Sequence, residues 1–241
     1  MTESARFSWT VLLPVKVLAR AKSRLAVLAG DRRRELALAF ASDTVTAALA
    51  CPEVARVLVV TSDPVAGRLL AGLGAVIVAD EPADRSATRG AAAAAAAAPS
   101  VIGELGVQDA LNAALRHGAA VAARRWPGTG LAALTADLPA LSPAELATAL
   151  RAASPASAAF VPDAAGVGTT LYAVPPGGEF RPLFGGASRA RHAAAGAVEL
   201  AAGDLTGLRR DVDTPDDLRA ALALGVGPFT QAAAANLFTD V

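Results

Sequence analysis

Residues 9–25 read Trp9-Thr-Val-Leu-Leu-Pro-Val-Lys-Val-Leu-Ala-Arg-Ala-Lys-Ser-Arg-Leu25. The apolar run at the start of this stretch predicts a first β-strand, and basic side chains follow it directly. In open α/β folds, the loop after the first strand usually contacts the ligand. The stretch therefore predicts the ligand-binding edge of an α/β sheet.

The basic part of this stretch is unusual in composition. Of the 22 lysines and arginines in the chain, only two are lysines, Lys16 and Lys22, and both lie here. A lysine offers a compact, mobile charge with three donors, which suits phosphate oxygens. Together with Arg20 and Arg24, the two lysines predict a phosphate-binding loop. A solvated basic loop is the competing interpretation.

The rest of the chain alternates apolar, β-branched runs with amphipathic stretches rich in alanine and leucine. This alternation is typical of βαβ units and predicts an α/β fold, with a mostly parallel mixed sheet of about seven strands flanked by helices. We expect strands at residues 10–15, 56–61, 75–79, 130–135, 158–161, 169–174 and 208–212. We expect helices at residues 32–49, 65–73, 108–124, 143–152 and 215–224, with start signals at Asp63, Ser142 and Thr214.

A length of 241 residues suits one domain, which we place at residues 1–225. Residues 84–104 read as a low-complexity insertion, with eight consecutive alanines at 91–98. Residues 226–241 read as a C-terminal tail that packs against a partner or is disordered.

Composition narrows the function classes. The chain carries 22 acidic and 22 basic residues, so no overall field favours nucleic acid or an anionic membrane. The N-terminus lacks the apolar core of a signal peptide, and no apolar run has the length of a membrane span, so we expect a cytoplasmic enzyme. Cys51 is the single cysteine, and we expect a buried, inert thiol.

Acidic residues stand where two predicted strands end. Asp137 follows one strand, and Asp211 and Asp213 share one face of the other if that segment is extended. Carboxylates completed by substrate phosphates are the oxygen ligands that Mg²⁺ prefers, so these positions predict a magnesium site. Helix capping competes as an explanation for Asp213, and it is our interpretation of Asp216 and Asp217.

A third stretch combines glycines, hydroxyls and charge. Residues 166–172 and 184–192 bring flexible backbone N–H groups together with Arg189 and Arg191, a combination that suits a phosphate or a carboxylate. His192 is a weak candidate for an anion contact. Ordinary turns explain the glycines equally well, and Ser188 is also a candidate helix cap.

Common catalytic motifs are missing from the sequence. There is no P-loop, no Gly-x-Gly-x-x-Gly after the first strand, no Gly-x-Ser-x-Gly elbow and no His-Glu-x-x-His. This absence disfavours a hydrolase with a catalytic histidine or cysteine.

Several short motifs occur in the order seen in one family. They are Leu13-Pro-Val-Lys16, Ala21-Lys-Ser-Arg-Leu25, Leu111-Asn-Ala-Ala-Leu115, Ala136-Asp-Leu-Pro139, Gly168-Thr-Thr170, Phe184-Gly185 with Ser188, and Asp211-Val-Asp-Thr-Pro215. From Trp9 to Leu224 the chain resembles the guanylyltransferases that activate phosphoenolpyruvate or 2-phospholactate in coenzyme F(420) biosynthesis. It departs from them before Asn112, where the family usually has a glycine-rich lead-in.

The resemblance implies a fold, an activity and a set of site residues. It implies a single Rossmann-like nucleotidyltransferase domain that transfers GMP from GTP to the phosphate of either acceptor and releases pyrophosphate. It further implies that Lys16, Lys22 and Arg24 hold the GTP phosphates, that Asp137 and Asp213, with Asp211 beside them, bind Mg²⁺, and that Thr170, Gly185 and Ser188, with Asn112, bind the acceptor.

Two alternatives stay open at this point. One is another nucleotidyltransferase of the same fold, using CTP or a molybdopterin-type acceptor, and the other is a non-catalytic nucleotide-binding protein. The expected partners are GTP, the acceptor and a downstream transferase that uses a labile product, without nucleic acid or membrane. We expect a monomer or a homodimer.

Overall fold

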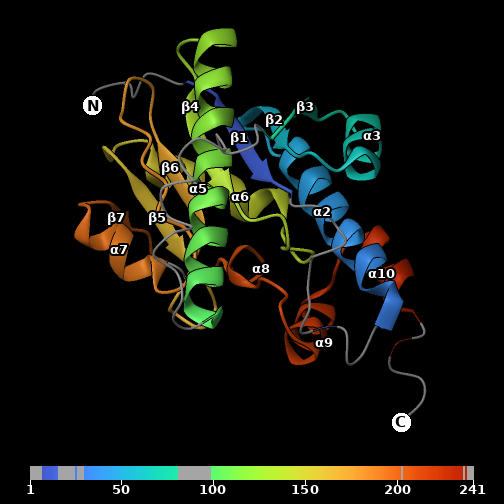
Figure 1. The fold of residues 1–241 in the computed structure, drawn as a ribbon. Helices are drawn as coiled ribbons and strands as arrows, with labels where there is room; N and C mark the ends of the chain where they lie inside the picture. Colours follow the sequence, from blue (N-terminus) through green and yellow to red (C-terminus); the bar gives the residue numbers. More distant parts are fainter. Residues whose placement is uncertain are drawn as a thin grey trace.

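The structure is a computed structural model that describes residues 7–15, 25, 30–80, 99–201, 203–235 and 237. Within these residues the chain forms a seven-stranded sheet with the strand order β3-β2-β1-β4-β6-β5-β7 (Figure 1). The strands are β1 (Trp9–Pro14), β2 (Val54–Val60), β3 (Val76–Val78), β4 (Gly130–Leu134), β5 (Ala159–Pro162), β6 (Thr169–Val174) and β7 (Val198–Glu199).

Most neighbouring strands are parallel. The strands β3, β2, β1 and β4 run in one direction and β7 is parallel to β5, whereas β6 is antiparallel to both β4 and β5. The predicted fold class, a mostly parallel mixed sheet in an α/β domain, is confirmed. Because β6 is reversed, it begins at the sheet edge where β1 and β4 end.

Three helices begin at the predicted signals. Ser142 and Thr214 form capping boxes, and the side chain of Asp63 accepts hydrogen bonds from the N–H groups of Val65 and Ala66. The described helices are η3 (Gly30–Arg32), α2 (Arg33–Leu49), α3 (Pro64–Gly72), α5 (Pro99–Arg125), α6 (Pro143–Ala153), α7 (Ser188–Ala194), α8 (Thr206–Arg209), α9 (Pro215–Leu224) and α10 (Pro228–Ala234).

Helices cover both faces of the sheet. The long helix α5 crosses one face, and α2, α3 and α6 pack on the other (Figure 1). Gly118 lets α5 approach closely, because an added Cβ there would lie 2.7 Å from Val60 Cγ2. The two faces therefore hold two separate apolar clusters.

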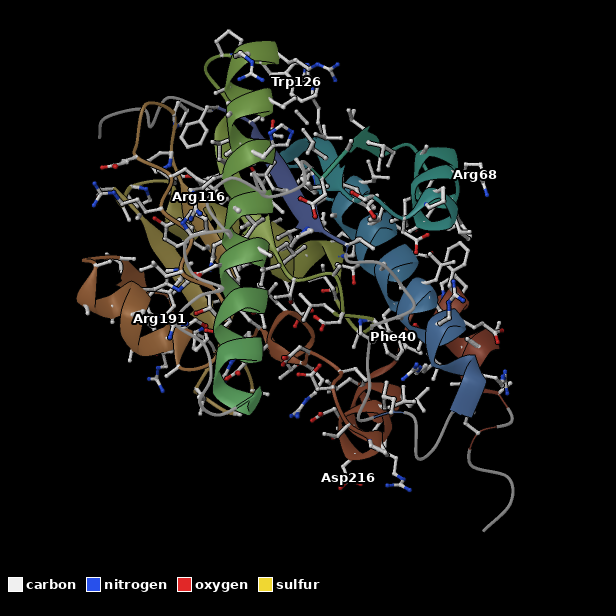
Figure 2. The ribbon with its side chains drawn as sticks, in the orientation of Figure 1. Phe40, Arg68, Arg116, Trp126, Arg191 and Asp216 are labelled. Atoms are coloured by element: carbon white, nitrogen blue, oxygen red, sulfur yellow. The ribbon has the colours of Figure 1, made fainter. Side chains whose placement is uncertain are left out.

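A third apolar cluster lies between α2 and the C-terminal helices. It contains Leu25, Phe40, Val212 and Leu218, all fully buried. Figure 2 labels Phe40 on α2. In this cluster, Leu25 and the C-terminal helices pack against α2.

The predicted strand at residues 208–212 is wrong. Leu208 lies in the short helix α8, and the segment does not join the sheet. The N–H of Gly207 donates to Glu145 Oε1 at 2.7 Å, and the Arg209 guanidinium donates to the carbonyls of Pro162 and Asp163. Such long-range contacts override the strand pattern of a short apolar run.

The remaining differences concern short or terminal elements. The edge strand β7 and the helix α7 were not predicted, and α5 begins at Pro99 rather than at residue 108. Helix α5 therefore contains the last residues of the proposed insertion. The alanine run at 91–98 lies outside the described residues.

Part of the predicted C-terminal tail forms α10 on α2. The carboxylate of Asp43, which is 4% exposed, accepts hydrogen bonds from the N–H groups of Phe229 and Thr230 at 3.1 and 2.7 Å. Asp43 therefore caps a helix that is distant in sequence. An added Cβ at Gly227 would collide with the Asp43 side chain, so glycine is needed for this approach.

Two smaller predictions concern Cys51 and membrane insertion. Cys51 is 2% exposed and burial raises the pKa of its thiol, which confirms a buried cysteine. Among the described helices, none combines the length and the apolar character that a membrane crossing requires.

Candidate active site

The candidate site lies at the edge of the sheet where β1 and β4 end and β6 begins. The N–H of Thr135, the first residue after β4, donates to the carbonyl of Thr170 at 3.0 Å. Alternation along the strands places the two threonine side chains on the same face as Ala133 and Tyr172, which belong to the apolar cluster between the sheet and α5. The two hydroxyls therefore belong to one face of the sheet.

The basic segment follows β1 in the sequence, and β1 ends at this edge. Its flanks are described: the N–H of Val15 donates to the carbonyl of Val60 at 2.9 Å, and Leu25 is fully buried. The predicted phosphate contacts lie outside the described residues; they are Lys16, Lys22 and Arg24, with Arg20 beside them.

The loop that carries Asp137 is held from three directions. The buried Thr44 hydroxyl on α2 accepts from the N–H of Leu138 at 3.1 Å. The N–H of Val212 donates to the carbonyl of Asp137 at 3.1 Å, and the N–H of Gly227 donates to the carbonyl of Pro139 at 3.0 Å. These bonds fix the backbone of Asp137 and place it beside the segment of Asp211 and Asp213.

Asp211 and Asp213 flank Val212 on an irregular segment rather than on a strand. Val212 is fully buried, Asp211 is half-buried and Asp213 is exposed. Throughout the described part of the chain, no three or more His, Cys, Asp or Glu side chains gather closely enough to hold a metal ion by themselves. A metal bound here would therefore take further oxygen ligands from outside these described side chains.

Asp216 and Asp217 have the helix-terminal roles that we predicted. Asp217 Oδ2 accepts from the N–H of Thr214 at 2.9 Å and completes the capping box of α9. Asp216, which Figure 2 labels, pairs with Arg219 at 2.6 Å on the exposed surface of α9. Both side chains are thus explained by the local structure of this helix.

Asn112 on α5 holds the turn that contains Gly185. Its side-chain amide donates from Nδ2 to the carbonyl of Phe184 at 3.1 Å, and its Oδ1 accepts from the N–H of Phe184 at 2.9 Å. The amide satisfies both backbone groups of Phe184, much as a neighbouring strand would. Asn112 is therefore a positioning residue for the turn.

The turn itself needs glycine. Gly185 and Gly186 have φ values of 98° and 42°, which favour glycine. A Cβ on Gly185 would also collide with the side chain of Gln108 on α5. Ser188 follows the turn as the first residue of α7, is 1% exposed, and donates its N–H to the carbonyl of Gly186 at 2.8 Å.

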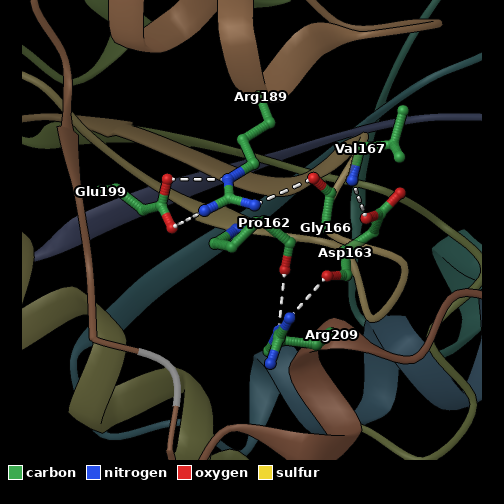
Figure 3. Close-up of polar contacts among 7 residues, drawn as sticks. All are labelled: Pro162, Asp163, Gly166, Val167, Arg189, Glu199 and Arg209. Atoms are coloured by element: carbon green, nitrogen blue, oxygen red, sulfur yellow. Dashed lines mark hydrogen bonds and ion pairs between the residues drawn. The ribbon is translucent and has the colours of Figure 1, made fainter.

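The two arginines of this region are used within the chain. Arg189 pairs with Glu199 at 2.8 Å and donates to the carbonyl of Gly166 at 3.0 Å (Figure 3). Arg191, which Figure 2 labels on α7, donates to the carbonyls of Leu183 and Gly185. Both guanidinium groups support turns of the chain, and their role as anion contacts stays a prediction.

The glycine-rich turn before β6 already binds a carboxylate of the chain. Asp163 accepts from the N–H groups of Val167 and Gly168 at 2.8 and 2.7 Å, and Figure 3 shows the first of these bonds. The turn has the anion-binding character that the sequence indicates, but an internal aspartate occupies its N–H groups. These N–H groups are therefore committed to the fold.

His192 is a buried, neutral side chain. Its Nε2 accepts from the N–H of Leu183 at 3.0 Å, so the proton is on Nδ1, which lies 3.0 Å from Thr169 Oγ1. Burial and then the charge of Arg191 lower its pKa to about 4. The ring stacks on Tyr172 at 4.7 Å. The anion contact considered for His192 is therefore wrong.

Sequence reasoning missed three residues that shape this site. Thr44 supports the Asp137 loop, Asp43 beside it caps α10, and Thr135 lies next to Thr170. One feature could have indicated Asp43 and Thr44: both are polar residues within a helix that is largely buried. No such feature indicated Thr135, because a threonine at the end of a strand is common.

Comparison with known proteins first defines the class. No family model matches the chain. A solved structure described as a nucleotide-diphospho-sugar transferase from Desulfovibrio desulfuricans aligns with a TM-score of 0.57 at 15% identity, over 90% of this chain and 96% of that one. A nucleotidyl transferase from Methanothermobacter aligns at 0.50 and 17% identity, over 90% and 97%. The fold is that of the nucleotidyltransferases.

Curated relatives then define the family. The chain is 58% identical over 230 residues to phosphoenolpyruvate guanylyltransferase of Streptomyces avermitilis, covering 95% of each chain. It is 53% identical over 236 residues to the protein of that name from Thermomonospora curvata, covering 98% of this chain and 92% of the relative. The chain belongs to the phosphoenolpyruvate guanylyltransferase family and is an enzyme of the transferase class.

Proposed function

We propose that this chain transfers GMP from GTP to the phosphate of phosphoenolpyruvate, with release of pyrophosphate, in coenzyme F(420) biosynthesis. The observation that carries the proposal is the 58% identity to a phosphoenolpyruvate guanylyltransferase over 95% of both chains. The carboxylates, hydroxyls and glycine turn at one sheet edge are consistent with it.

The reaction suits a site without a catalytic histidine or cysteine. A phosphate oxygen of the acceptor attacks the α-phosphorus of GTP, a new P–O–P bond forms, and the bond from the α-phosphorus to pyrophosphate breaks. A phosphate monoester has a second pKa near ~6, so the nucleophile is already ionised at neutral pH. The enzyme needs to position two anions and to offset their charge rather than to remove a proton.

Positive charge for the GTP phosphates comes from the segment after β1. Lys16, Lys22 and Arg24 are our proposed contacts, because they cluster in sequence directly after the strand that reaches the site edge. Their role in the transition state is electrostatic: they stabilise the charge that moves onto the leaving pyrophosphate.

A divalent metal fits the carboxylates that follow β4 and flank Val212. Asp137 and Asp213, with Asp211 as a further oxygen donor, are the residues that would hold it, since the backbone bond from Val212 to Asp137 joins the two segments. Oxygen ligands from two segments, completed by phosphate oxygens, match the preference of Mg²⁺. Such an ion would neutralise charge on the reacting phosphates.

The acceptor would be bound by the hydroxyls of β6 and α7 and by the glycine turn before α7. We propose that Thr170, Gly185 and Ser188 contact the acceptor, and that Asn112 keeps the turn in place through Phe184. Thr170 and Ser188 are each 1% exposed, so a group that reaches them leaves bulk water. Exclusion of water protects the new anhydride from hydrolysis.

The test is a reaction of the purified chain with GTP, Mg²⁺ and either phosphoenolpyruvate or 2-phospholactate. Mass spectrometry follows the guanylylated product, and a coupled assay follows pyrophosphate. We expect a guanylylated product from phosphoenolpyruvate. Because this product is labile, the assay includes a downstream enzyme that consumes it as it forms. Product only from 2-phospholactate, or only with CTP, would contradict the proposed substrates.

A further inference from the structure

Two buried hydroxyls at the site edge lack a partner within the described part of the chain. They are Thr135 Oγ1 and Thr170 Oγ1, both shielded from solvent. Buried hydroxyls nearly always make a hydrogen bond, so an unpaired one requires an explanation. Two of them on opposite residues of neighbouring strands require a common explanation.

The backbone places the two hydroxyls close together. Thr135 and Thr170 are paired by the backbone hydrogen bond of 3.0 Å that continues the β4–β6 ladder. Opposite residues of an antiparallel pair have Cβ atoms about 4.5–5.5 Å apart and point to the same face. One oxyanion with two oxygens can therefore accept from both hydroxyls.

The surroundings of the pair favour an anion of the acceptor. Thr135 is two residues from Asp137, so their Cα atoms lie within about 7 Å of each other. The Gly185 turn, held by Asn112, packs through Phe184 in the same apolar cluster as Tyr172, which follows Thr170 on the same strand face. A small phosphorylated acid can reach from the hydroxyls toward Asp137.

We propose that Thr135 donates a hydrogen bond to an oxyanion of the acceptor, beside Thr170, and is a further acceptor-binding residue. This inference rests on the proposed function, which supplies the acceptor. Both hydroxyls act as donors, and an ionised oxygen is the acceptor that gains most from them, because charge-assisted bonds are the stronger ones. Bound acceptor thus satisfies both buried hydroxyls at once.

The test compares Thr135→Val, which keeps the shape and removes the hydroxyl, with Thr135→Ser, which keeps the hydroxyl. We expect the valine variant to raise the KM for phosphoenolpyruvate by about 10–100-fold and to change the KM for GTP by less than about twofold. The serine variant should stay within a few-fold of wild type in both constants.

Thr230→Val is the matched control. Thr230 Oγ1 is also buried without a partner among the described residues, but it lies on α10. We expect this variant to keep the wild-type KM for phosphoenolpyruvate. Equal effects of the two valine substitutions would overturn the inference.

The remaining outcomes separate this inference from the proposed function. An active, folded Thr135→Val variant with unchanged KM for phosphoenolpyruvate would overturn the inference alone and assign the hydroxyl to a bound water. A rise in the KM for GTP instead would place Thr135 on the nucleotide side and also overturn it. No product from wild type would overturn the proposed function and this inference with it.

Discussion

At this site, the role of an individual residue depends more on the groups that it contacts than on its amino-acid type. The N–H groups of the glycine turn at 166–168 look ready for a ligand in sequence, yet Asp163 takes two of them. His192 has the chemistry of a base, yet burial keeps it neutral. Asp137 is different, because its backbone is held by the fold at the end of a parallel strand, where ligands bind in open α/β sheets.

Asp137→Asn tests the proposed metal role. The asparagine keeps the backbone carbonyl that accepts from Val212, so we expect the fold to remain. Loss of the carboxylate charge should lower kcat by roughly a hundredfold or more, since metal-assisted charge stabilisation contributes several kcal/mol. Steady-state kinetics and circular dichroism measure the two effects.

Asp216→Asn is the control for that experiment. Asp216 is an exposed aspartate on α9 that pairs with Arg219, and we expect its substitution to leave kcat within about twofold of wild type. Wild-type turnover in a folded Asp137→Asn variant would remove Asp137 from the metal site.

The lowered pKa of His192 predicts that the free energy of unfolding depends on pH. Its pKa is lowered to about 4 in the folded chain, whereas an unfolded histidine has its ordinary value near ~6.5. Between these values the unfolded chain binds more protons, so stability falls as the pH falls from about 6.5 to 4. The full loss is about 3 kcal/mol.

Urea unfolding of the wild type and of His192→Gln between pH 4 and 7 measures this contribution. We expect the variant to be less stable at neutral pH but to lose less stability on acidification. Gln231→Ala, on the exposed surface of α10, removes no titratable group and is the control that should keep the wild-type slope. An identical pH slope in the wild type and in His192→Gln would show that His192 does not titrate as described.

At the scale of elements, local signals were predictable and distant contacts were not. The capping boxes at Ser142 and Thr214 involve residues three positions apart, so the sequence displays them completely. Residues 208–212 follow a strand pattern, but Glu145 and the Arg209 contacts from elsewhere in the chain turn them into a short helix and a loop. The motif Leu111–Leu115 indicated that Asn112 has a role. The residue that Asn112 binds, Phe184, is 72 positions away and could not be identified from the sequence.

The turn between β6 and α7 depends on Asn112, and this dependence is testable. Asn112→Ala leaves the N–H and the carbonyl of Phe184 without their side-chain partner, which should cost about 1–3 kcal/mol of stability. Because the same turn carries Gly185, we expect the KM for phosphoenolpyruvate to rise more than the KM for GTP.

Gln231→Ala, on the exposed surface of α10, is the control for the Asn112 experiment. Chemical denaturation and initial-rate kinetics give both quantities on the same protein preparations. A stable Asn112→Ala variant with unchanged kinetics for both substrates would show that the turn is held by other contacts.

At the scale of the whole molecule, the fold brings the end of β1, the end of β4 and the segment with Asp211 and Asp213 to one edge of the sheet. The basic segment follows β1, Asp137 follows β4, and the segment with Asp211 and Asp213 is joined to Asp137 through Val212. The α/β class was predictable from the alternating pattern, and the family was predictable from motifs in order. The supporting residues Asp43, Thr44 and Thr135 were not, because each acts through a residue far away in the sequence.

The central claim is that a phosphate oxygen of phosphoenolpyruvate attacks the α-phosphorus of GTP. The direct measurement uses phosphoenolpyruvate labelled with ¹⁸O in its phosphate and mass spectrometry of both products. We expect the label to stay entirely in the guanylylated product and to be absent from pyrophosphate. Label in pyrophosphate, or GDP and free phosphate in place of pyrophosphate, would contradict the claim.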